Sequence, residues 1–77
     1  MISELPIEKQ KQWYFDAVEG YIVYKGHLKE EAEKGVRQYR LKERLDISPD
    51  AIMHYCVEDI GDDIIRDYIR NPIASTA

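Results

Sequence analysis

Apolar residues recur at helical spacing in three stretches of this chain, and a proline or a glycine stands at most of their ends. In the first stretch Tyr14, Val18 and Ile22 lie on one face of a helical wheel, with polar residues opposite. Pro6 suits the first helical position, which needs no amide donor, and Gly26 suits a C-terminal stop. We therefore expect a helix over about residues 6–25.

Residues 20–26 leave a second interpretation open. Two glycines bracket a run of β-branched and aromatic residues there, which is also typical of a short strand. Such a strand has no partner elsewhere in the chain, and an unpaired strand is a poor element. The helix is favoured, and the strand requires that two copies of the chain pair.

The second stretch contains a change of helical phase. Acidic residues at its start and basic residues at its end suit the helix dipole. Leu41 and Leu45, however, fall about half a turn out of phase with the apolar face of a helix over 28–39. We expect that helix to break near Arg40 and a short helical turn to cover 41–46.

The third stretch begins with the strongest local start motif of the chain. Ser48-Pro49-Asp50 combines a capping serine, a proline suited to the first helical position and an acid in the first turn. The apolar pattern then predicts one helix over 49–70, ended by Asn71-Pro72. The fold prediction is thus a single all-α domain over 1–77, a three- or four-helix bundle, with residues 1–4 and 72–77 frayed.

The apolar faces of these helices also predict the core. The expected core residues are Trp13, Tyr14, Val18, Tyr21, Val36, Tyr39, Ile52, Cys56, Ile60 and Ile64.

Composition narrows the class of protein. The 77 residues carry one cysteine, too few for an intrachain disulfide, and no apolar run approaches the roughly 20 residues of a membrane span. The N-terminus lacks the pattern of a secretion signal, so we expect a cytoplasmic protein. The net charge of −4 disfavours a general nucleic-acid binder, and all of the excess acid lies in residues 48–77.

No residue set predicts catalysis. His54, Glu58 and Asp62 are spaced four apart and could ligate a metal, but no second histidine-rich helix completes such a shell. The aspartates around Asp62 read as a solvated face, and Cys56 lies on an apolar arc. We assign no catalytic, cofactor-binding or metal-binding residue and expect no enzyme. A metal-dependent enzyme is the weakest alternative.

Residues 34–44 carry five basic side chains against one acid, and this segment is called the basic stretch below. The candidate contacts to phosphate or to an acidic partner are Lys34, Arg37, Arg40, Lys42 and Arg44. They support nucleic-acid binding as the main alternative function. The alternative is a purely structural role, in which these side chains stabilise a helix end and pair with acids of the same chain.

Apolar residues on two faces of the predicted third helix indicate association. Ile65 and Ile69 fall well off the main apolar arc, with Tyr55 on the same outer side, and Val23 lies on the polar side of the first helix. The leading hypothesis is a non-enzymatic interaction protein, a regulator or adaptor, that forms a homodimer through its third helix. The sequence leaves open whether the chain itself covers this face, and it does not identify a partner.

Overall fold

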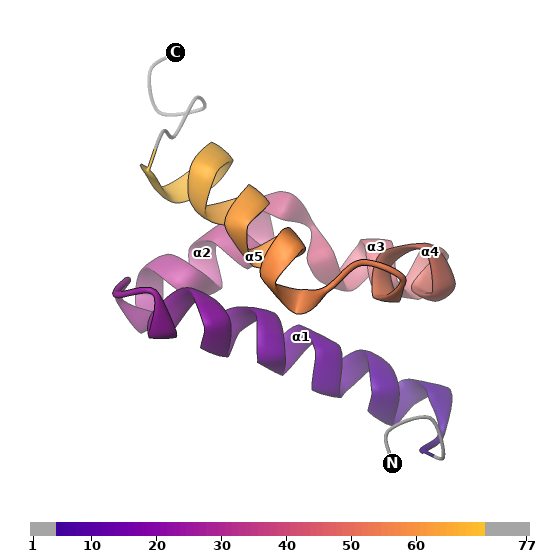
Figure 1. Cartoon of the computed structure of the whole chain (residues 1–77). Helices are drawn as coiled ribbons and strands as arrows, with labels where there is room; N and C mark the ends of the chain where they lie inside the picture. Colours follow the sequence, from indigo (N-terminus) through magenta and orange to yellow (C-terminus); the bar gives the residue numbers. More distant parts are fainter. Residues whose placement is uncertain (1–4, 71–77) are drawn as a thin grey trace.

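The computed structural model describes residues 5–70 and confirms the all-α prediction; there is no strand among these residues (Figure 1). The helices are α1 (Ile7–Tyr24), α2 (Lys29–Tyr39), α3 (Leu41–Ile47), α4 (Pro49–Met53) and α5 (Val57–Ile64), and a π-helical segment, η2 (Ile65–Arg70), continues α5. The long α1 runs along one side, α5 lies over it with α2 behind, and α3 and α4 sit together at one end (Figure 1). The predicted frayed ends and the Asn71-Pro72 stop lie outside the described residues.

The end of α1 confirms the helical interpretation of residues 20–26. Gly26 adopts φ 102°, a left-handed conformation that glycine reaches at little cost. Its N–H donates to Val23 O at 2.9 Å, and the His27 N–H donates to Ile22 O at 3.4 Å. This pair of bonds is the Schellman motif, which satisfies the last carbonyls of the helix.

The predicted break near Arg40 is also confirmed. Arg40 lies in the left-handed region, with φ 62° and ψ 43°, and separates α2 from α3. Arg44 Nε donates to Tyr39 O at 2.7 Å, and its guanidinium lies 4.4 Å from the centre of the Tyr39 ring. Restarting the helix in this way turns Leu41 and Leu45 into the core, where both are buried.

The prediction of one helix over 49–70 was wrong. A helix begins at Pro49, although the Ser48 side chain makes no cap hydrogen bond, and it ends at Met53. Residues 54–56 form a turn before α5, and the buried Tyr14 hydroxyl donates to Tyr55 O in that turn at 2.8 Å. A long-range hydrogen bond therefore satisfies a carbonyl that a continuous helix would have bonded internally, and the weak helix formers of this segment offer little resistance.

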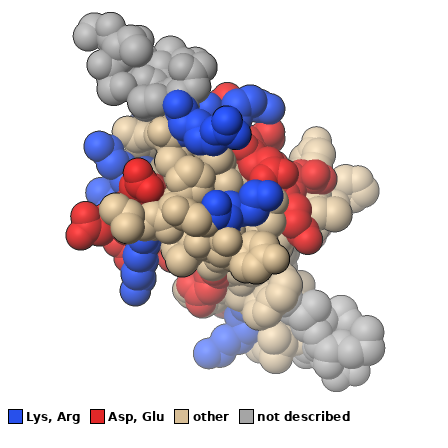
Figure 2. Space-filling view, turned by 60° about the vertical axis from the view of Figure 1, so that its left-hand side comes forward, with Lys and Arg blue, Asp and Glu red and all other residues tan. Residues whose placement is uncertain are grey.

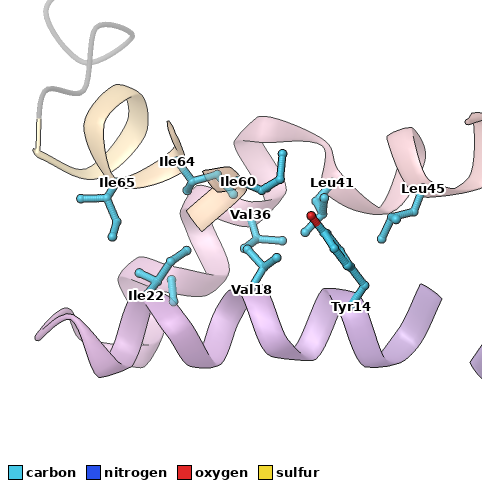
Figure 3. Close-up of a cluster of buried hydrophobic side chains, with 10 residues drawn as sticks. Tyr14, Val18, Ile22, Val36, Leu41, Leu45, Ile60, Ile64 and Ile65 are labelled. Atoms are coloured by element: carbon cyan, nitrogen blue, oxygen red, sulfur yellow. The ribbon is translucent and has the colours of Figure 1, made fainter. Parts of the chain in front are cut away.

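The core lies where α1, α2, α3 and α5 meet (Figure 3). Its buried side chains are Tyr14, Val18, Ile22, Ala32, Val36, Leu41, Leu45, Ile60, Ile64 and Ile65. Five of the predicted core residues are among them, and Tyr21, Tyr39 and Ile52 are partly buried against them. Trp13 and Cys56 are exposed, so their assignment to the core was wrong.

The structure also corrects the outward placement of Ile65 and Ile69. Ile65 is only 6% exposed and points toward α1 beside Ile22 (Figure 3), while Ile69 reaches α2 at Gly35. The α5–η2 element packs against both α1 and α2, so its own chain covers two of its faces. The i→i+5 bonding of a π-helix also differs from the helical period assumed in the prediction.

Candidate functional site

An open groove of about 610 Å³ lies between the N-terminal half of α1 and the turn that joins α4 to α5. Trp13 and Tyr55 line it and are 52% and 53% exposed. Met53, Cys56 and Val57 also line it. Exposed aromatic rings beside an apolar hollow are the composition of interface cores rather than of ordinary helix surfaces.

The fold builds this groove from α1 outward. Tyr14 points into the core, and Trp13, its neighbour on the helix, is turned away from the core toward solvent. The hydroxyl of Tyr14 holds the carbonyl of Tyr55 at 2.8 Å and lies 3.5 Å from that of Cys56. Burial raises the pKa of Tyr14 to about 12, so this hydroxyl keeps its proton and remains a donor. One side chain thus positions the 54–56 turn against α1.

The charged side chains that line the groove are both acidic. Asp50 comes from the first turn of α4 and Glu58 from the first turn of α5, and the lining contains neither lysine nor arginine. Neither carboxylate forms an ion pair within residues 5–70. His54 adds a polar ring that packs edge-on against Tyr55 at 5.9 Å between centroids. The groove lining is therefore mainly apolar and aromatic, with two acidic side chains.

The structure brings only one of the four predicted interface residues to this groove. That residue is Tyr55; Val23 is exposed toward the far end of α1, Ile65 is buried in the core, and Ile69 is partly buried against it. Sequence reasoning missed Trp13 because it placed the residue in the core. Its position on the wheel, beside the arc of Tyr14, Val18 and Ile22 and not within it, was the available indication.

The lysine and arginine side chains of the basic stretch are exposed. Lys34, Arg37, Arg40 and Lys42 are exposed and form no ion pair within residues 5–70. Arg44 is engaged with Tyr39 at the end of α2.

Acidic side chains also lie among these bases. A shallow hollow that contains Arg37 and Lys42 is lined by Glu19, Glu33 and Glu43 as well. On the face in Figure 2, basic side chains lie at the top, at the left and near the centre, and acidic side chains gather at the right and at the left edge. The expected pairing of the basic stretch with acids of the same chain is absent from residues 5–70.

The residues considered for metal binding are separated by the turn. His54 lies in the turn while Glu58 and Asp62 lie on α5, and Asp62 accepts a hydrogen bond from the Tyr21 hydroxyl at 2.8 Å. This bond raises the pKa of Tyr21 to about 12. Within residues 5–70, no group of three or more His, Cys, Asp or Glu side chains is placed to hold a metal ion.

The chain was compared with known protein families, curated proteins and solved structures, and none of them matches it. No helix among residues 5–70 has both the length and the apolar character needed to span a bilayer. The candidate site therefore rests on the geometry of the groove.

Proposed function

We propose that this protein is a non-enzymatic interaction protein that binds another protein through the groove between α1 and the α4–α5 turn. The observation that carries the proposal is the pair of half-exposed rings, Trp13 and Tyr55, beside an apolar hollow. Tryptophan and tyrosine are enriched among the residues that dominate binding energy at protein interfaces. We still propose a regulator or adaptor, but we place its interface at the groove and no longer at Ile65 and Ile69.

The hydrogen bond from Tyr14 supports this proposal because it restrains the groove before any partner arrives. A binding surface that is already ordered loses less conformational entropy on association. The same bond is made to the backbone of the turn between α4, which ends at Met53, and α5, which begins at Val57.

Nucleic-acid binding through the basic stretch is supported less well by the geometry. Its bases are mixed with acids around the hollow at Arg37, and Arg44 already serves the end of α2. A continuous basic surface is what phosphate recognition requires.

The test is selection from a library of random peptides displayed on phage, with the full chain as bait. Each selected peptide is then measured against two variants, Tyr55→Ser in the groove and Tyr24→Ser near the C-terminal end of α1. Both tyrosines are well exposed, at 53% and 83%, so neither change disturbs the core. We expect peptides that lose binding to Tyr55→Ser and keep it to Tyr24→Ser. Failure to select any peptide, or equal effects of both variants, would overturn the proposal.

A further inference from the structure

We infer that the occupant of the groove is a cationic amphipathic helix supplied by a separate protein. This inference rests on the proposed function and adds the charge, the conformation and the source of the bound segment. Three properties of the groove support it.

The first property is charge. Asp50 and Glu58 line an apolar hollow whose lining contains neither lysine nor arginine, and no side chain within residues 5–70 pairs with them. A partner that inserts apolar side chains beside these carboxylates must bring lysine or arginine at its flanks. Opposite charge at a rim steers association, and like charge there costs binding energy.

The second property is the helical nature of the walls. α1 forms one wall, and α4, the 54–56 turn and the start of α5 form the other, so no strand edge is available within residues 5–70 to pair with an extended peptide. A helical segment satisfies its own backbone hydrogen bonds and needs no strand edge. Amphipathic helices meet this condition and are a common occupant of apolar grooves.

The third property is that two identical acidic grooves would repel each other, which disfavours a second copy of this chain. In a two-fold dimer the same patch meets itself, so the Asp50 and Glu58 carboxylates of both copies would be brought together at one interface. The basic stretch lies on α2 and α3. A copy that used it to reach the groove of the next would make a head-to-tail contact, which gives a ring or an open filament and not a two-fold dimer.

Trp13 provides the assay because it is the only tryptophan of the chain and lines the groove. The probes are peptides of about 18 residues, long enough to form a helix when bound, and they contain neither tryptophan nor tyrosine. One carries leucine at positions i, i+3, i+4 and i+7 with lysine elsewhere. A second replaces every lysine by glutamate, and a third has the leucine and lysine residues in scrambled order.

We expect the leucine–lysine helix to shift Trp13 emission to shorter wavelength and to saturate at one peptide per chain. Its affinity should exceed that of the leucine–glutamate peptide about tenfold, because the Asp50 and Glu58 carboxylates attract lysine and repel glutamate. Added salt should reduce this difference in affinity. The scrambled peptide should bind more weakly. Asp50→Lys together with Glu58→Lys should reverse the preference, Tyr55→Ser should weaken binding, and Tyr24→Ser should leave it unchanged.

Several outcomes would overturn this inference while leaving the proposed function in place. One is equal binding of the leucine–lysine and leucine–glutamate peptides at the groove. Another is selection of library peptides that need Tyr55 but lack basic residues or the helical pattern. A third is a dimer, in solution without peptide, that Tyr55→Ser dissociates, since this would identify the occupant as a second copy. If neither the designed peptides nor any library peptide binds, the proposed function itself fails.

Discussion

The close approach of α5 to α1 at Gly61 gives the sharpest test of the fold. A methyl group placed on Gly61 would overlap Cδ2 of Tyr21 and stand 2.9 Å from Cε2 of the same ring. Gly20 lies in the middle of α1, and a methyl group there would meet nothing within 4 Å. Gly61→Ala and Gly20→Ala are therefore the same chemical change in two different environments.

Helix propensity favours alanine at both positions by about 0.5–1 kcal/mol. At Gly20 this gain stands alone, so Gly20→Ala should stabilise the protein by that amount. At Gly61 the gain is opposed by overpacking, which typically costs about 1–3 kcal/mol. The ring can make room only by tilting, which strains the hydrogen bond from the Tyr21 hydroxyl to Asp62. Gly61→Ala should then destabilise the protein by about 1–3 kcal/mol, since that lost bond adds to the overpacking.

Urea unfolding followed by circular dichroism at 222 nm measures both changes, provided that the slope with urea concentration is the same in all variants. A third variant isolates the cause. In a Tyr21→Ala background the obstructing ring is absent, so adding Gly61→Ala should be neutral or stabilising. A Gly61→Ala protein as stable as the parent, or an equal loss in the Tyr21→Ala background, would refute the claimed packing of α5 on α1.

Three further predictions concern the turns and the tyrosines. Arg40→Gly should stabilise the protein by about 0.5–1 kcal/mol in urea unfolding, because glycine adopts the left-handed conformation of this position without strain. Gln38→Gly, inside α2, should destabilise the protein, and a loss of stability in both variants would count against the left-handed conformation of Arg40. Tyr14→Phe should cost about 1 kcal/mol and accelerate amide hydrogen exchange in residues 54–59, whereas unchanged exchange would show that the hydroxyl does not hold the turn. Burial and the bond to Asp62 raise the pKa values of Tyr14 and Tyr21 from 10.0 to about 12. Unfolded tyrosines lose their protons first, so stability is complete below pH 10 and falls as the pH rises toward 12. The melting temperature should decrease as the pH rises through this range, and it should decrease less steeply in Tyr14→Phe. A melting temperature that does not change with pH would contradict this prediction.

The parts of the fold that follow from local chemistry could be predicted from the sequence. Gly26 ends α1 because a left-handed residue is needed there, and Pro49 begins α4 because its missing amide donor is not required at that position. The change of phase at Leu41 located the break at Arg40. Each of these effects depends on residues within one or two turns of the site.

The turn at residues 54–56 could not be predicted in the same way. The hydrogen bond that supports it comes from Tyr14, 41 residues earlier in the chain than Tyr55. A periodicity argument treats 49–70 as one helix, and that assumption misplaced Cys56 and Ile65. The burial of Ile65 likewise depends on the packing of α5 and η2 against two other helices, which is a tertiary arrangement.

The candidate groove could not be predicted from the sequence for the same reason, because it is formed by tertiary contacts. Tyr55 was named from the sequence as an interface residue, but its partner Trp13 was assigned to the core, and nothing local indicated that the two would share a groove. The basic stretch attracted attention because charge is visible in a sequence. Its interspersed acids and the engagement of Arg44 with Tyr39 required three-dimensional information.

The proposed binding surface for a protein partner lies between α1 and the α4–α5 turn. The most direct measurement is a titration of the ¹⁵N-labelled chain with a library-selected peptide, followed by amide chemical shifts. We expect the largest changes on residues 10–14 and 53–58, with the Trp13 indole N–H among them. Changes confined to the basic stretch, or spread evenly over the surface, would contradict it.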